Sequence, residues 1–385
     1  MIMKKIYALI MAVGASVAGL SAQQALWGVP ALLSPEINPD NTVTFRLKAP
    51  GASSVKVTGD FLAGRTAEMA CDSAGVWTFT SSSVAPEMYR YNFVVDGLTV
   101  TDPSNVFELR DVCTVFNYFI VQGEGSELYE VSDVPHGTVA KVWYDSPKLG
   151  LKRRMSVYTP PGYEASVDRY PVLYLLHGMG GDEDAWLTQG RAAQIFDNLI
   201  AKGEMQPMIV VMPNGNASQE AAPGETHFGL VPPTIALPHT MDGAFEEAFP
   251  DLIVFVDKNF RTLADKSHRA IAGLSMGGYH SHHVSKQYPD MFDYVGLFSA
   301  AITPRSDDSE IYKHREAKLK RQFTNAPALY WIGIGKDDFL YAENETLRKE
   351  FDNIGLKYVY HESDGGHIWK NWRAYLSTFA PMLFR

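Results

Sequence analysis

The sequence has few cysteines, no excess of basic charge and, beyond its first residues, no long apolar run. Its 385 residues include only 2 cysteines, Cys71 and Cys113, which are too few for a cysteine-based metal site or a thiol nucleophile. These two thiols either pair as a disulfide in an oxidising compartment or lie buried and reduced. Acidic residues outnumber basic ones by 44 to 34, and no basic stripe is present, which argues against nucleic acid as a partner. Nothing in the sequence indicates a cofactor.

The N-terminal residues have the pattern of an export signal. Lys4 and Lys5 precede an apolar run from Ile6 to Leu20, and small residues follow up to Ala22. The alternative is a membrane anchor, but the run is shorter than the roughly 20 residues that span a bilayer. We therefore expect a signal peptide at residues 1–22, no membrane span, and an exported protein that is periplasmic or secreted.

Residues 23–123 are predicted to form an all-β, immunoglobulin-like sandwich. Short segments alternate polar and apolar side chains, as in 42–48, 54–58 and 89–95, and Asp96-Gly97 is typical of a hairpin turn. Such short strands separated by Pro and Gly favour two packed antiparallel sheets. The polar residues 124–135 are interpreted as a linker.

From residue 136 to 385 the pattern changes to that of an α/β fold. Apolar runs of strand length alternate with amphipathic stretches of helix length, which indicates a mainly parallel sheet with helices on both faces. The expected strands are 155–158, 172–176, 208–212, 270–274, 294–298, 329–333 and 358–361, and the expected helices include 245–260, 278–288 and 343–354.

A Gly-x-Ser-x-Gly motif at residues 273–277 lies between an expected strand and an expected helix. A sharp turn there lifts a serine hydroxyl above the sheet edge, and the flanking glycines leave room for the backbone. The sequence therefore predicts Ser275 as a catalytic nucleophile.

A serine nucleophile needs a base and an acid that orients the base, and in this arrangement both follow the serine in the chain. His367 lies in a glycine-rich loop after the last expected strand, whereas His280, His282 and His283 lie on the helix directly behind the serine. The strand at 329–333 leads into Asp337 and Asp338. We predict His367 as the base and Asp338 as the acid, with Asp337 as the alternative.

Two backbone N–H groups should hold the oxyanion. One is that of Met276, after the nucleophile, and the other that of Met179, with Gly178 as the alternative, in the loop after the strand 172–176. His177 is expected to hold this loop. A metal site at His280 and His283 is disfavoured, because no carboxylate has the spacing of a known zinc helix.

Two tryptophans flank the loops that carry these groups. Trp186 and Trp369 are candidates for a substrate platform, with packing in the core as the alternative for both.

The ordered motifs of the second part resemble carbohydrate esterase family one, the esterase D-like group of α/β hydrolases that includes feruloyl esterases. The motifs that carry the resemblance are 159–163, 170–181 with Trp186, 269–278 and 365–369. The resemblance implies the α/β-hydrolase fold, Ser275, Asp338 and His367 as triad, and Met179 and Met276 as oxyanion donors.

Residues 25–123 resemble the early-set domain of starch-active enzymes, akin to carbohydrate-binding module family forty-eight, through 43–50, 75–77 and 91–97. Together the two resemblances imply a secreted feruloyl esterase that acts on plant xylan, with a plant polysaccharide or oligosaccharide ester as partner. The alternatives are an acetyl xylan esterase, a siderophore-trilactone esterase of the enterochelin type, and a glycan-binding protein without catalysis.

Overall fold

The computed structural model describes residues 32–62, 65–227, 234–235, 237–304 and 308–385. The expected signal peptide, residues 1–22, lies outside the described residues. No helix within the described ranges combines the length and the apolar character that crossing a bilayer requires. The described residues divide into two compact units, one of residues 32–84 with 90–107 and the other of residues 85–89 with 108–385. The predicted linker, 124–135, lies within the second unit.

The first unit is built from antiparallel strands, as expected. Alternating apolar residues such as Val43, Phe45, Val55 and Val57 are buried between two sheets. One sheet has the order β1-β2-β6-β5, and the other contains the strands β4-β3-β7, with β8 paired to β7. The strands are β1 Glu36–Ile37, β2 Val43–Lys48, β3 Val55–Gly59, β4 Thr66–Glu68, β5 Ala70–Cys71, β6 Val76–Thr80, β7 Glu87–Val95 and β8 Leu98–Val100.

The second unit contains an eight-stranded sheet in the order β11-β12-β14-β13-β15-β16-β17-β18. All neighbours from β14 to β18 are parallel, while β11 and β12 form an antiparallel edge. The bounds are β11 Thr138–Ser146, β12 Leu151–Thr159, β13 Val172–Leu176, β14 Ile209–Pro213, β15 Arg269–Leu274, β16 Tyr294–Phe298, β17 Leu329–Gly335 and β18 Val359–Ser363.

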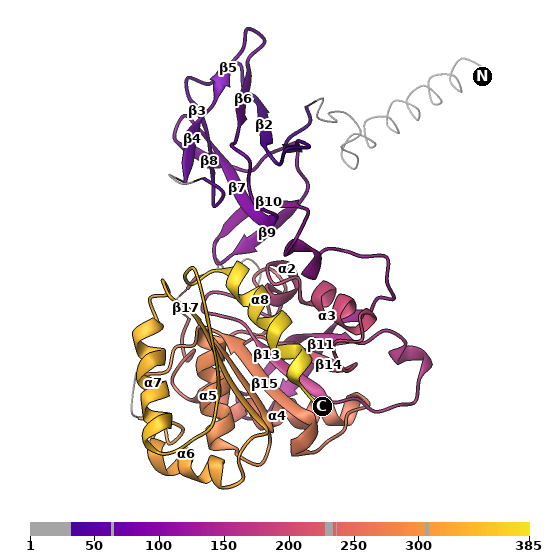
Figure 1. Cartoon of the computed structure of the whole chain (residues 1–385), viewed down its shortest axis with the longest axis vertical. Coiled ribbons are helices and arrows are strands. Elements are labelled where there is room, and N and C mark those ends of the chain that lie inside the picture. The colour runs from indigo at the N-terminus through magenta and orange to yellow at the C-terminus, as the bar shows by residue number, and fades with distance from the viewer. Residues whose placement is uncertain (1–31, 63–64, 228–233, 236, 305–307) are drawn as a thin grey trace, which may run out of the picture. The chain divides into compact units, whose positions relative to one another are not determined.

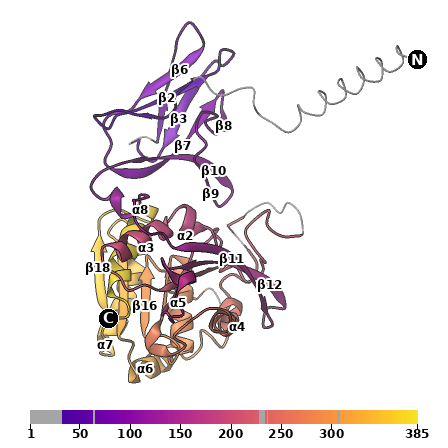
Figure 2. The same cartoon turned by 90° about the vertical axis from the view of Figure 1, so that its right-hand side faces the viewer.

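Helices cover both faces of this sheet, which confirms the α/β-hydrolase fold (Figures 1 and 2). Leu173 and Leu175 of β13 face α3 and α8, while Tyr174 and Leu176 face α4 to α7, because successive side chains on a strand alternate. The helices are α2 Ala185–Thr188, α3 Ala192–Ala201, α4 Ala244–Asn259, α5 Met276–Gln287, α6 Arg315–Thr324, α7 Tyr341–Asn353 and α8 Trp369–Phe379.

A hairpin of β9 (Glu108–Asp111) and β10 (Thr114–Val121) belongs to the second unit, although its sequence was assigned to the sandwich. Leu109 packs in the same core cluster as α3 and α8.

The cysteines differ from both expectations, because Cys71 and Cys113 are free and exposed.

Candidate active site

Ser275 occupies a tight turn between β15 and α5. Its φ of 53° lies in the left-handed region, which L-residues rarely adopt and which marks a locally strained backbone. Neighbouring backbone segments approach this turn closely. A Cβ on Gly277 would lie 2.3 Å from the Leu176 oxygen, and a Cβ on Gly273 would lie 2.5 Å from the Gly277 backbone. Glycine is therefore required on both sides of Ser275, as the motif predicts.

The loop after β13 passes beside this turn. A Cβ placed on Gly178 would lie 3.4 Å from the Ser275 Cβ, so the two backbones are in van der Waals range. The Met179 side chain packs against the cluster that contains Met276, the first residue of α5. The first N–H groups of a helix have no partner within the helix. The two expected oxyanion donors thus come from segments that meet next to Ser275.

His177 holds this loop against the loop that follows β14. Its Nε2 accepts the Gly215 N–H at 2.7 Å, and its Nδ1 lies 2.7 Å from the Gly178 oxygen. Burial lowers the pKa of His177 to about 4, so the ring is neutral at neutral pH. Both ring nitrogens are engaged, which leaves His177 no role as a base.

The structure brings His367 to Asp338 rather than to Asp337. His367 Nδ1 lies 2.9 Å from Asp338 Oδ2 and 3.1 Å from Oδ1, and the Leu340 N–H donates to Asp338 Oδ1 at 2.9 Å. Burial alone would raise the pKa of Asp338, but the hydrogen bonds from His367 and Leu340 outweigh it and lower the pKa. Asp337 is exposed. An ionised Asp338 fixes the Nδ1–H tautomer and leaves Nε2 to accept a proton.

Backbone contacts join the loops that carry the acid and the base. The Asp337 N–H donates to the Gly365 oxygen at 3.0 Å. Asn371 of α8 donates from Nδ2 to the Asp364 oxygen at 3.1 Å and to the Gly366 oxygen at 3.0 Å. Asn371 was not predicted, because nothing in its local sequence distinguishes it from a surface residue of a helix.

The two tryptophans proposed as a substrate platform differ in their burial. Trp186 is 1% exposed, and its Nε1 donates to the Leu176 oxygen at 2.9 Å, so it packs in the core. Trp369 is partly buried, with its ring centroid 5.3 Å from that of Trp186. By contrast, Phe339 is 75% exposed, and its ring centroid lies 4.5 Å from that of His367. An aromatic residue directly after the predicted acid was the available cue.

The three histidines of α5 are buried and have separate partners. Nδ1 of His280 lies 2.9 Å from Glu246 Oε1, Nδ1 of His282 lies 2.8 Å from the Tyr330 hydroxyl, and Nδ1 of His283 lies 3.0 Å from Lys286 Nζ. Among the described residues, no three His, Cys, Asp or Glu side chains are grouped as metal ligands would be. These histidines are core residues of the helix that supports Ser275.

Comparison with known proteins gives a consistent result. Residues 146–383 match the family described as "Putative esterase". The chain is 34% identical over 366 residues to an endo-1,4-beta-xylanase/feruloyl esterase of Xylanibacter ruminicola, a match that covers 91% of this chain but 46% of the relative's length. It therefore spans about half of that relative.

Two solved structures share the fold. A ferulic acid esterase is 28% identical, with a TM-score of 0.51, and the match covers 64% of this chain and 97% of that one. The enterobactin esterase of Shigella flexneri is 16% identical, with a TM-score of 0.61, over 89% of this chain and 93% of that one. From the residues that match the family and from the 34% identical relative, we conclude that the chain belongs to the esterase family.

Proposed function

We propose that this protein removes feruloyl or related hydroxycinnamoyl groups from the side chains of plant xylan, with Ser275, His367 and Asp338 as its catalytic triad. The observation that carries the triad is the contact between His367 Nδ1 and the buried Asp338, 2.9 Å long, in loops that follow β17 and β18, parallel strands of the sheet in which the Ser275 turn follows β15. A histidine oriented in this way serves as general base for a serine.

The reaction follows from these positions. Ser275 Oγ attacks the ester carbonyl carbon while its proton passes to His367 Nε2, and the N–H groups of Met276 and Met179 hold the resulting oxyanion. The C–O bond to the sugar then breaks, and the leaving oxygen takes the proton from His367. Water adds to the acyl-enzyme by the same route, which releases the hydroxycinnamic acid and restores the Ser275 hydroxyl.

The choice of acyl group rests on the relatives and on one feature of the site. The Xylanibacter relative carries xylanase and feruloyl esterase in its name, and the 28% identical structure is a ferulic acid esterase. At the proposed site, the exposed ring of Phe339 next to His367 offers an apolar surface on which a sugar face or an aromatic ring can stack.

A substrate panel tests this function. Wild-type protein and Ser275→Ala are assayed on methyl ferulate, feruloylated xylan oligosaccharides, acetylated xylan and a catecholate trilactone. We expect release of ferulate by the wild type and none by Ser275→Ala. Turnover of acetylated xylan alone would replace the feruloyl assignment with an acetyl one.

A siderophore-trilactone esterase is the second candidate, because the enterobactin esterase matches 89% of this chain. Against it, an anionic iron chelate favours a basic site, and this chain has a formal net charge of −10. Turnover of the trilactone in preference to the feruloyl esters would establish this alternative.

We also propose that the protein is exported, because residues 1–22 have the composition of a signal peptide. Fractionation of the producing cell, with N-terminal sequencing of the mature protein, should find it outside the cytoplasm and starting near Gln23. An intact Met1 in the cytoplasmic fraction would contradict this.

A further inference from the structure

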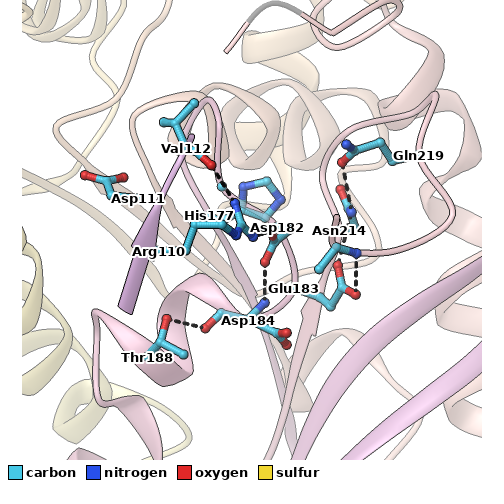
Figure 3. Close-up of polar contacts among 12 residues, drawn as sticks. Arg110, Asp111, Val112, His177, Asp182, Glu183, Asp184, Thr188, Asn214 and Gln219 are labelled. Atoms are coloured by element: carbon cyan, nitrogen blue, oxygen red, sulfur yellow. Dashed lines mark hydrogen bonds and ion pairs between the residues drawn. The ribbon is translucent and has the colours of Figure 1, made fainter. Parts of the chain in front are cut away.

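The hairpin β9–β10 contacts the loop that carries Met179. Arg110 Nη2 forms an ion pair with Asp182 of that loop, and its Nη1 donates to the Val112 oxygen at 2.8 Å (Figure 3). Asp182 is 3% exposed at its side chain, so this pair is largely shielded from water. Gln189 Nε2 also donates to the Arg110 oxygen at 3.3 Å. The tip of the hairpin is thus attached to both ends of the segment 182–189.

Val112 also packs closely against this loop. A Cβ on Gly180 would lie 2.5 Å from Val112 Cγ2, which leaves no room for a side chain at Gly180. Val112 is the first residue of the two-residue turn and has a φ of 53°, where glycine is favoured and a β-branched residue is an outlier. A strained residue that persists in a fold is a pointer to function.

The other flank of the same loop is fixed by the core of the hydrolase unit. Asn216 Nδ2 donates to the Gly181 oxygen at 2.9 Å, and Arg154 Nε donates to Glu183 Oε1 at 2.7 Å. Asn214 Nδ2 donates to Glu183 Oε2 at 3.1 Å, as Figure 3 also shows. The loop is therefore held from two sides, by the hydrolase core on one and by the hairpin on the other.

We propose that Arg110 and Val112 are positioning residues that set the place of the Met179 N–H in the oxyanion hole. The inference rests on the proposed function, because it assumes that this N–H holds the oxyanion. An N–H donor contributes only if it lies within hydrogen-bond distance of the atom on which the charge develops. A small shift of the loop therefore reduces the stabilisation of the transition state more than it reduces the binding of the substrate. Full turnover therefore requires a segment outside the α/β core, namely the hairpin β9–β10.

The first test compares Arg110→Ala, Arg110→Lys and the wild type on a p-nitrophenyl ester and on methyl ferulate. We expect kcat of Arg110→Ala to fall between about ten- and a hundredfold with KM within about twofold, and Arg110→Lys to recover part of the loss. Arg46→Ala is the matched control, since Arg46 has the same 29% side-chain exposure and also pairs with a carboxylate, Glu36. Its kcat should equal that of the wild type.

Val112→Gly separates positioning from stability. Glycine relieves the backbone strain at φ 53°, so the thermal midpoint should stay equal or rise, while kcat falls because the contact with Gly180 is lost. Folded Arg110→Ala and Val112→Gly with wild-type kcat would overturn the proposal, as would losses of kcat that only track the thermal midpoint. Lack of turnover of every ester by the wild type would overturn the proposed function, and this inference with it.

Discussion

At the scale of single residues, the two adjacent carboxylates of the acid loop have opposite environments. Asp338 is buried and contacts His367, whereas Asp337 is exposed. We predict that Asp338→Asn lowers kcat by about 10³- to 10⁴-fold, because the amide no longer favours the tautomer in which Nε2 accepts a proton. Steady-state kinetics on methyl ferulate measure this.

Asp337→Asn is the control for that variant, since it changes a neighbouring carboxylate without touching the imidazole. Its kcat should stay within about twofold of the wild type. If the two variants showed the reverse order, Asp337 would be the acid and the assignment made from the geometry would be wrong.

Phe339 gives a second prediction at this scale. Phe339 is 75% exposed beside His367, so Phe339→Ala should raise KM for feruloylated oligosaccharides several-fold, which corresponds to about 1 kcal/mol of lost stacking, with little change in the thermal midpoint. Leu98→Ala, at another exposed apolar side chain, is the control. Equal KM values for Phe339→Ala and the wild type would remove Phe339 from the substrate site.

The roles of these residues were predictable to different degrees. Ser275, Asp338 and His367 carry chemistry that few residue types provide, and their order along the chain restricts the choice. Aromatic residues carry no such restriction, because exposure depends on packing that is absent from the local sequence. For that reason Trp186 was a candidate although it is buried, and Phe339 was overlooked although it is exposed.

At the scale of elements, the turn between β15 and α5 depends on the absence of side chains. A Cβ on Gly277 would lie 2.3 Å from the Leu176 oxygen and 2.6 Å from the His177 oxygen, which are backbone atoms of β13 and its loop. We predict that Gly277→Ala lowers the free energy of unfolding by about 1–3 kcal/mol and reduces kcat, because the backbone must shift. Urea denaturation and kinetics measure both.

Gly51→Ala is the matched control for this substitution. A Cβ at Gly51 has no neighbour within 4 Å, so the stability should change by less than about 1 kcal/mol. A Gly277→Ala protein as stable and active as Gly51→Ala would contradict the close approach of the two backbones.

The strands with a clear hydrophobic pattern were predicted from the sequence. The strands that were missed lack such a pattern for physical reasons. The strands 172–176 and 294–298 were predicted at their observed bounds, because continuous apolar runs mark buried parallel strands. The edge strand β11 was missed, because most of its side chains are at least partly exposed and break the apolar run. The strand 115–121 was read from the sequence and corresponds to β10, but β9 and the hairpin that joins them were missed, because the turn holds Val112 and Cys113 instead of glycine or asparagine.

At the scale of the whole molecule, buried neutral histidines make stability depend on pH. The pKa of His177 is lowered by burial from its ordinary 6.5 to about 4, and burial also lowers the pKa of His282 and His283. Between pH 6.5 and 4 the unfolded chain binds a proton at His177 that the folded chain does not, so the stability falls as the pH falls through this window. At pH 5 the titration of His177 alone lowers the free energy of unfolding by about 2 kcal/mol.

Urea denaturation at pH 7.5 and pH 5 tests this linkage. Replacing His177 by asparagine should reduce the difference in unfolding free energy between the two pH values by about 2 kcal/mol. A pH dependence equal in His177→Asn and the wild type would contradict a buried, neutral His177.

The central claim is that Ser275 is the nucleophile of an ester hydrolase and that His367, oriented by Asp338, activates it. The most direct measurement is the intact mass of the protein after incubation with a fluorophosphonate, followed by peptide mapping. We expect one adduct at Ser275, none in Ser275→Ala, and much slower labelling in His367→Ala, which removes the base. Folded wild-type protein that stays unlabelled, or that carries the adduct at another residue, would contradict it.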